Sequence, residues 1–249
     1  MSILKNTPGN LKSGLIEILL IFIGVTIAVA FGNWNDKRKE KIIEKNYLEL
    51  LSGEVNENRI TLDRMILKYN SKIEVLKKIM DLTGPESFPI SMHSFDSLLF
   101  LGLSSPNFEL TNSTTDELLS SGNGNLIRDI NLRILISQWN NYYKFYNSSD
   151  QKTTLDLLEK YIHNEGSFAN IDKTANRSTY SKELKPANFF NLDNRKMLKD
   201  PVFQNLISDH LRSYIWFNDK YMNIKVSLDN LSVTLNKNIG NYLPSQDNL

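Results

Sequence analysis

The hydrophobic and polar positions divide the chain into one uniformly apolar segment and several segments whose apolar residues recur every three or four positions. The apolar segment covers residues 15–34 and contains one charged side chain, Glu17. A helix of this length rises about 30 Å, which matches the hydrocarbon core of a bilayer. The pattern predicts a transmembrane helix over residues 14–35, with Trp34 as its anchor at the membrane interface.

Two other interpretations of this segment are open, a cleaved signal peptide and a buried core helix. A signal peptide has a shorter apolar region, followed by a cleavage site with small residues. Here a polar, helix-forming sequence follows Trp34 at once. We therefore expect an uncleaved membrane anchor.

Three small residues, Gly24, Ala28 and Gly32, lie four positions apart within the span. This spacing places them on one face of a helix, where small side chains let two membrane helices approach closely. The face predicts self-association of the anchor into a homo-oligomer. A monomeric anchor with incidental small residues is the alternative.

Glu17 lies seven residues before Gly24 and therefore projects from the same face. A carboxylate within a membrane is costly, and it can indicate a proton-coupled element or a charge that pairs with a partner. We favour a simpler interpretation, in which Glu17 lies near the headgroups and approaches Lys12 and the amides of the first turn.

Residues 37–81 contain no proline and one glycine, Gly53, and the sequence Thr83-Gly84-Pro85 follows. This predicts one long helix that continues the anchor. Its apolar positions alternate three and four residues apart: Leu62, Ile66, Tyr69, Ile73, Leu76 and Met80. Such a stripe must pack on another helix, either in a second chain or antiparallel within this one.

The middle of the chain predicts shorter elements. Residues 83–112 form a connector with a small helix near 95–103, and Thr114 with Glu117 has the capping-box spacing of a helix that ends at residues 121–124. A further helix carries a largely aromatic stripe and resumes after a polar break, at Leu132, Leu135, Trp139, Tyr142 or Tyr143, Tyr146, Leu155, Leu158 and Ile162. We expect this stripe to be core, with a pocket between helices as the alternative. Residues 164–192 predict a long loop.

Asp200 and Pro201 predict the start of the last helix, with Asp200 as N-cap and proline at the tolerated first position. Its apolar stripe is the most regular in the chain: Phe203, Ile207, His210, Tyr214, Phe217, Tyr221, Ile224, Leu228, Leu231 and Leu235. We expect this helix to pair antiparallel with residues 37–81. The domain organisation is thus a short N-terminal segment (1–13), the span (14–35), a helical bundle (36–243) and a polar tail (244–249).

Composition limits the chemistry. Lys and Arg total 29 against 28 for Asp and Glu, so the net charge of +1 does not favour nucleic acid as a partner. The chain has no cysteine and three histidines without ligand spacing, and we expect no metal site, cofactor or catalytic residue. We expect His210 to be a core histidine, with a pH-sensitive switch as the alternative.

The charges flanking the span favour a cytoplasmic C-terminal part by local count. Two basic residues precede the span, and five follow it closely: Lys37, Arg38, Lys39, Lys41 and Lys45. A long following segment can nevertheless be translocated regardless of charge. The local count therefore leaves the orientation open.

Three short stretches, in order, resemble a family of uncharacterised bacterial single-span membrane proteins known only as a domain of unknown function. They are residues 17–44, with Ile23-Gly24, Ile27-Ala28 and Asn33-Trp34-Asn35; residues 116–143; and residues 198–206. The resemblance implies an inner-membrane anchor and a mostly helical, periplasmic C-terminal domain. It implies no enzyme activity or cofactor. The weakly basic N-terminus departs from the family pattern.

We therefore expect an all-α protein in which one N-terminal transmembrane helix precedes an elongated helical bundle with long, coiled-coil-like helices. The expected function is non-enzymatic, that of a membrane-anchored interaction or scaffold protein whose partners are the lipid bilayer and another envelope protein. The alternative is a ligand-sensing helical bundle that signals through a partner. A bound small molecule would favour sensing, and a stable protein partner would favour scaffolding.

Overall fold

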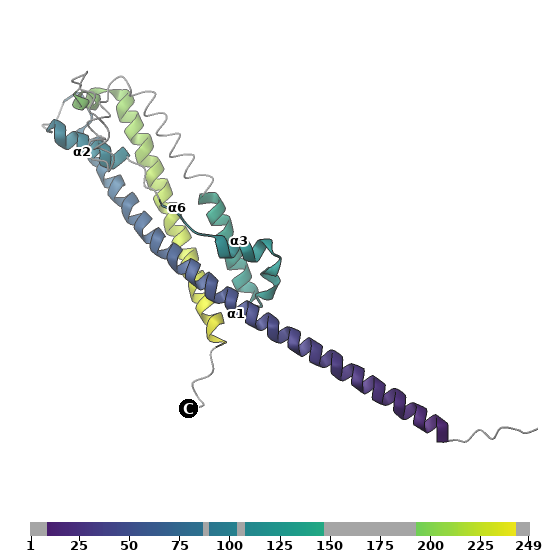
Figure 1. Cartoon of the computed structure of the whole chain (residues 1–249). Helices are drawn as coiled ribbons and strands as arrows, with labels where there is room; N and C mark the ends of the chain where they lie inside the picture. Colours follow the sequence, from purple (N-terminus) through teal and green to yellow (C-terminus); the bar gives the residue numbers. More distant parts are fainter. Residues whose placement is uncertain (1–8, 87–89, 104–107, 147–192, 243–249) are drawn as a thin grey trace, which may run out of the picture.

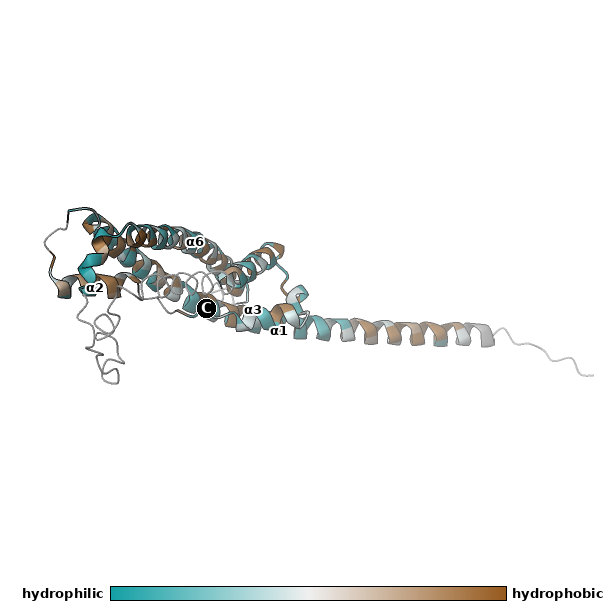
Figure 2. Cartoon of the chain, turned by 90° about the horizontal axis from the view of Figure 1, so that it is seen from above, coloured by the Kyte–Doolittle hydropathy of each residue, from teal (hydrophilic) through white to brown (hydrophobic). Residues whose placement is uncertain are grey.

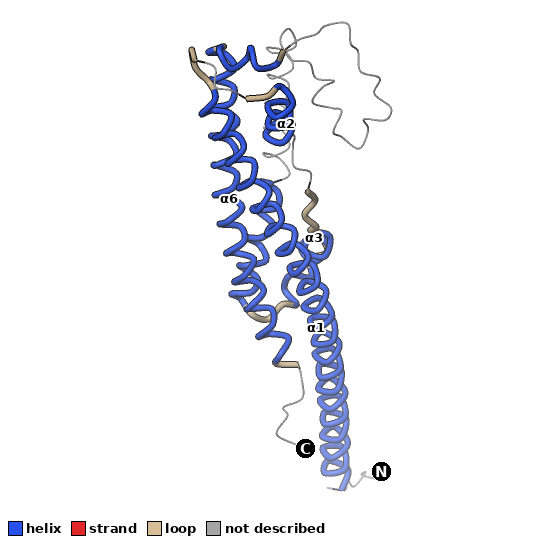
Figure 3. The backbone as a smooth tube through the Cα atoms, turned by 90° about the vertical axis from the view of Figure 1, so that its left-hand side faces the viewer, coloured by secondary structure: helices blue, strands red, loops and turns tan. Residues whose placement is uncertain are grey.

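The computed structural model describes residues 9–86, 90–103, 108–146 and 193–242 (Figure 1). All regular structure in these residues is helical, which confirms the all-α class (Figure 3). In chain order the elements are α1 (Gly9–Leu82), α2 (Met92–Leu103), α3 (Ser113–Ser120), the 3₁₀ turn η1 (Asn123–Leu126), a helix over 130–146, the 3₁₀ turn η2 (Asn194–Lys199) and α6 (Pro201–Gly240). The predictions for the extreme N-terminus, for residues 155–162 and 164–192 and for the polar tail lie outside the described residues.

Helix α1 runs without interruption for 74 residues and fills the interval between Pro8 and Pro85. Its first half stands clear of the bundle as a projecting apolar rod, whereas its second half packs against the other helices (Figure 2). This confirms that the long helix continues the apolar segment. The first half is long and apolar enough to cross a membrane, and its most apolar window has no residue buried by the rest of the protein.

The second half of α1 pairs antiparallel with α6, as expected from the two apolar stripes. The side-chain contacts run in opposite directions along the two helices: Arg59 Nε donates to Asp229 at 2.6 Å, Lys225 pairs with Asp63, and Asn218 donates to Asn70 at 2.9 Å. The stripe of α1 therefore has its partner in the same chain. Figure 3 shows the two helices side by side.

All ten residues of the predicted α6 stripe are buried. The prediction for α1 needs a correction, because Ile66 and Met80 are only half-buried while Met65 and Ile79 are fully buried. Ile66 and Met80 still pack against the core, and Ile79 is covered by α2, which approaches α1 closely at Gly102. A Cβ added at Gly102 would lie 3.3 Å from the Ile79 side chain. This second contact widens the packed face of α1 beyond a single stripe.

Aromatic side chains form the centre of the α1–α6 interface. The Tyr69 ring lies 5.4 Å edge-on from Tyr214, and its centroid is 5.2 Å from that of Tyr221. His210 is 4% exposed, and its ring meets Tyr214 edge-on at 6.0 Å. These rings bury a large apolar area in specific pair geometries. His210 is therefore a core residue.

The predicted capping box at Thr114 is wrong. Helix α3 begins at Ser113, its N-cap is Asn112, and no side chain of its own segment caps it. Glu54 of α1 does so instead, because its carboxylate accepts from the Thr114 amide at 2.7 Å and from the Thr115 hydroxyl at 2.7 Å. A residue distant in sequence thus replaces the local cap.

The predicted start of α6 and the predicted end of α3 are confirmed, whereas α2 begins at Met92, before the predicted residue 95. Asp200 accepts a hydrogen bond from the Val202 amide at 2.8 Å, and Pro201 is the first helical residue of α6. Helix α3 ends before Gly122, whose φ of 76° is the left-handed conformation that favours glycine.

Candidate functional site

The apolar half of α1 is the clearest functional feature of the chain. Its large apolar side chains between residues 15 and 31 are 44–68% exposed, whereas Leu48 and Leu51, farther along the same helix, are 1% exposed. Water solvates such a continuous apolar surface poorly, and a bilayer solvates it well. The sequence and the burial therefore both indicate that this half of α1 could cross a membrane.

The small-residue face of this span is open. A Cβ added at Gly24 or Gly32 would meet no atom within 4 Å, and Ala28 and Glu17 are exposed. The regular helix keeps all four residues on one face, because their spacings of seven, four and four residues are close to whole turns. Self-association through this face, and the interfacial role of Glu17, stay predictions.

Trp34 lies at the end of the apolar segment and is 56% exposed. Its ring centroid is 5.7 Å from that of Phe31, and the Arg38 guanidinium carbon lies 5.9 Å from the ring. The indole thus lies between an apolar ring on one side and a cation on the other. This amphipathic setting is typical of tryptophan at a membrane interface.

Beyond Trp34 the packed face of α1 carries buried polar residues that the apolar pattern did not reveal. Glu44 accepts the Arg128 amide at 2.8 Å and the Tyr242 hydroxyl, and it forms an ion pair with the Arg128 guanidinium at 3.4 Å. Burial, and then the nearby Glu44 carboxylate, raise the pKa of Tyr242 to about 12. These contacts join three distant segments at the end of the bundle nearest the span.

Asn58 and Glu54 extend this arrangement along α1. The Asn58 side chain donates to the Thr111 carbonyl at 2.7 Å and accepts the Thr111 amide at 2.8 Å. Together with the Glu54 cap on α3, these bonds fasten the residues around 111–128 to α1. We name Glu44, Glu54 and Asn58 the polar clamp. Each carboxylate or amide is matched by a defined partner, which indicates a structural role.

Lys72 is the other unusual buried group of α1. Its ammonium donates to the Leu101 carbonyl in the last turn of α2 at 2.9 Å. Burial, and then the nearby charge of Lys68, lower the pKa of Lys72 to about 8. A cation near the carboxyl end of a helix is well placed electrostatically, and it helps to hold α2 on α1.

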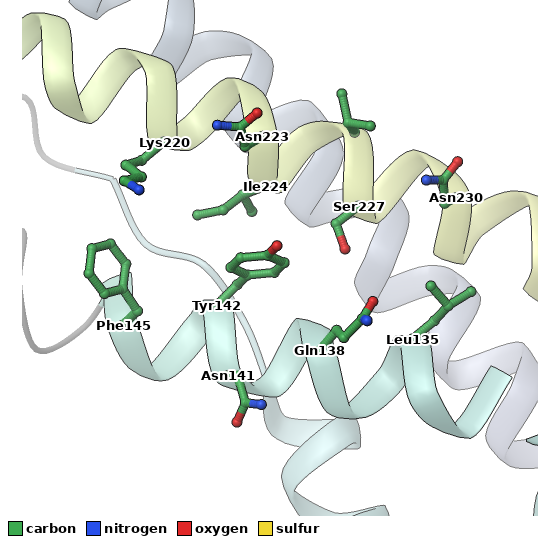
Figure 4. A pocket seen from close by; sticks show the side chains of 11 residues that line it. Leu135, Gln138, Asn141, Tyr142, Phe145, Lys220, Asn223, Ile224, Ser227 and Asn230 are labelled. Atoms are coloured by element: carbon green, nitrogen blue, oxygen red, sulfur yellow. The ribbon is translucent and has the colours of Figure 1, made fainter. Parts of the chain in front are cut away.

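A groove of about 670 Å³ lies between α6 and the helix over 130–146 (Figure 4). Its walls are mainly amides and aromatic or aliphatic side chains: Leu135, Gln138, Asn141, Tyr142, Phe145, Lys220, Asn223, Ile224, Val226, Ser227 and Asn230. In Figure 4 the side chains of Tyr142, Gln138 and Ser227 face the space between the two helices. Trp139 is 1% exposed and belongs to the core.

The groove offers hydrogen-bonding amides and one ammonium group, but its residues provide no obvious nucleophile with an adjacent base. Lys220 Nζ lies 5.4 Å from the ring centroid of Trp216, so its charge stands over an aromatic face at one end of the groove. Among the residues that the structure describes, no group of three His, Asp or Glu side chains could hold a metal ion.

Comparisons with known proteins found no matching family model, no matching curated protein and no matching solved structure.

Proposed function

We propose that this protein is a non-enzymatic interaction scaffold, which a single transmembrane helix holds at the surface of a bacterial inner membrane. The continuity of α1 supports this proposal most strongly, because the apolar rod and the core of the bundle belong to the same 74-residue helix. A helix without a linker transmits position and orientation from the membrane to the bundle. The bundle then presents its outer surface to another envelope protein at a fixed distance from the bilayer.

The outer surface of α6 supplies a feature suited to a protein partner. Four exposed apolar residues, Ile215, Met222, Val226 and Val233, recur at spacings of seven, four and seven. This spacing keeps them on one side of the helix. Val226 and Val233 are 60% and 69% exposed, so the described part of the bundle does not cover them, although Val226 also lines the groove between α6 and residues 130–146.

A photocrosslinking residue placed in the full-length protein tests the scaffold function in cells. We expect one discrete protein adduct from position 226 and none from position 74, where Glu74 is exposed on the opposite helix. The adduct is expected to disappear when residues 1–35 are removed, because the partner meets the bundle only at the membrane. The absence of a discrete adduct from positions 215, 222, 226 and 233 would contradict the proposal.

For orientation we propose a periplasmic bundle, on the basis of the family resemblance. The five basic residues that follow the span favour the opposite side. A single cysteine at Ser245 decides between the two, because the natural chain contains none. In spheroplasts, labelling by a membrane-impermeant maleimide supports the periplasmic side, and protection until lysis reverses the assignment.

Ligand sensing is the second candidate, and the groove between α6 and residues 130–146 favours it. A bound ligand there would contact two helices and could shift one against the other. Mass spectrometry of small molecules released from the purified full-length protein tests this function. A stoichiometric ligand that is lost in the Gln138→Ala and Asn223→Ala variants would favour sensing over scaffolding.

A further inference from the structure

A second cavity, of about 570 Å³, lies where α1 leaves the apolar span and meets the end of the bundle. We name it the juxtamembrane pocket. Its lining contains four cations, one carboxylate and one aromatic ring: Lys37, Arg38, Lys41, Arg128, Glu40 and Trp34. The formal charge of these side chains is strongly positive, although that of the whole chain is only +1. The pocket therefore concentrates positive charge at one place.

Two distant segments build this pocket. Lys37 and Lys41 lie one turn apart on α1, and the same side of the helix continues to the buried Glu44. Arg128 comes from the segment after η1, where Glu44 binds its backbone amide at 2.8 Å and its guanidinium at 3.4 Å. The Arg128 side chain is still 49% exposed, so it has N–H groups available for a ligand. Glu44 thus positions Arg128 beside the lysines.

Among the described residues, the three α1 cations of the juxtamembrane pocket form no ion pair with a carboxylate. Nearby, Lys39 pairs with Asp36 at 4.0 Å and Lys45 pairs with Glu49 at 3.5 Å. Within the described part of the chain, no carboxylate lies at ion-pair distance from Lys37, Arg38 or Lys41. The lining is thus suited to an external anion.

The position along α1 indicates which anion is available. Lys37 and Lys41 follow Trp34 by three and seven residues, which places them about 4–10 Å beyond it along the helix axis. The polar region of each leaflet is about 5–8 Å thick. With Trp34 at the hydrocarbon boundary, Lys37 lies at the depth of the lipid phosphates. The Lys41 side chain starts beyond this region and points back toward it, because helical side chains tilt toward the N-terminus.

We propose that the juxtamembrane pocket binds the phosphodiester headgroup of one anionic phospholipid, which Lys41 of α1 and Arg128 of the bundle hold between them. This proposal depends on one part of the proposed function, namely that α1 crosses a membrane. A headgroup in this place links the end of the bundle to the bilayer through Arg128. The bundle then has a second attachment besides the helix itself.

The test uses the full-length protein in nanodiscs that contain equal amounts of phosphatidylglycerol and phosphatidylcholine. Native mass spectrometry measures the ratio of phosphatidylglycerol-bound to unbound protein. We expect Lys41→Gln and Arg128→Gln each to lower this ratio about fivefold. Lys39→Gln and Arg133→Gln remove the same charge outside the pocket and are expected to leave the ratio unchanged. Lys41→Gln keeps the test valid if Arg128→Gln disturbs folding.

Three results would overturn the lipid site. They are equal binding of the two lipids, an equal loss of binding in the Lys39→Gln control, and displacement of phosphatidylglycerol by inorganic phosphate. The first two results would mean that lipid binding reflects only the general basic charge near the span. The third would mean that the pocket binds a soluble anion. Resistance of the protein to alkaline extraction, measured in parallel, reports on the membrane span alone, and the photocrosslinking result reports on the scaffold function.

Discussion

The two halves of α1 place similar apolar residues in opposite surroundings. Leu20 and Phe22 of the first half are 63% and 68% exposed, whereas Leu62 and Leu76 of the second half are fully buried. The second half also buries Glu44, Glu54 and Asn58, each with a hydrogen-bond partner. An apolar side chain thus does not reveal by itself whether the rest of the protein covers it. The distribution of polar residues around the helix does.

The largest expected loss of stability comes from truncating the α6 side chains that pack against the second half of α1. Phe217→Ala removes a ring that is 2% exposed and contacts Tyr69, and it should lower the free energy of unfolding by about 3–5 kcal/mol. Leu228→Ala should lower it by about 2–5 kcal/mol. Val226→Ala, at a position of α6 that is 60% exposed, is the matched control. Chemical denaturation followed by circular dichroism measures all three, and losses below about 0.5 kcal/mol for both core variants would show that α6 does not pack as described.

A charge placed in the apolar half of α1 should affect membrane insertion, whereas the same charge in the packed half should not. Val25→Arg puts a cation near the middle of the span, where insertion should become less favourable by about 2.5–3.5 kcal/mol. Leu67→Arg makes a similar change at a position of the packed half that is 69% exposed. The first variant should lose protein from the membrane fraction and the second should not. Full membrane integration of Val25→Arg would argue against residues 14–35 as the span.

The polar clamp predicts a smaller but specific loss. Glu54→Ala leaves the first amides of α3 and the buried Thr115 hydroxyl without their acceptor, which should cost about 1–3 kcal/mol for each group left unpaired. Glu57→Ala, an exposed neighbour on the same helix, should change the unfolding free energy by less than about 0.5 kcal/mol. Equal losses in the two variants would mean that the carboxylate of Glu54 does not cap α3.

Self-association through the open face of the anchor is expected to add a weaker interaction. Gly24→Ile with Ala28→Ile should hold two helices apart and reduce the dispersion contacts between them. Thr26→Ile with Ala30→Ile alters the opposite face and serves as the control. A transmembrane-association assay in a bacterial inner membrane compares them, using residues 12–36 and then the full chain.

The same assay tests Glu17. Glu17→Gln should leave association nearly intact if this carboxylate is interfacial, and a large effect would favour an intramembrane charge that pairs with a partner. Unchanged signal for the Gly24 and Ala28 double variant in both chains would exclude the anchor as an interface.

Lys72 should make the stability of the protein depend on pH. Burial lowers its pKa to about 8 in the folded protein, against 10.5 for an ordinary lysine, so the unfolded chain binds more protons between these values and stability rises with pH there. Below about pH 8 the penalty for burying the charge is fully present. Lys72→Met should therefore abolish the rise between pH 8 and pH 10. Exposed Lys78→Met is the control, and an unchanged slope in Lys72→Met would contradict the assignment.

The sequence predicted those helix faces and caps that depend on residues close together in the chain, and it missed those that depend on distant residues. All ten residues predicted for the α6 stripe are buried, because that face packs against α1, but Leu206 and Asn218 are buried as well and were not predicted. In α1, the burial of Ile79 was missed because α2 covers it from a second direction, whereas the predicted Ile66 and Met80 are partly buried against the core. The cap on α3 could not be found locally because Glu54 lies 60 residues before the Thr114 amide that it binds.

The candidate sites also differ in whether their residues are close together in the sequence. The span and Trp34 follow from a continuous run of apolar residues, whereas the groove and the juxtamembrane pocket combine side chains from segments far apart in the chain. Arg128 had no feature in its own neighbourhood that would connect it to Lys37 and Lys41. The buried Glu44 is the one available signal, since a carboxylate within an apolar stripe requires a partner.

The central claim is that one rigid helix passes from lipid into the bundle without a hinge, and a distance across the junction tests it directly. Spin labels at Phe31→Cys and Glu49→Cys, both exposed, lie 18 residues and five turns apart in an otherwise cysteine-free chain. In nanodiscs, double electron–electron resonance should give one narrow distance distribution, because the two backbone positions lie ~27 Å apart. A broad distribution, or a distinctly shorter distance, would contradict the continuous helix.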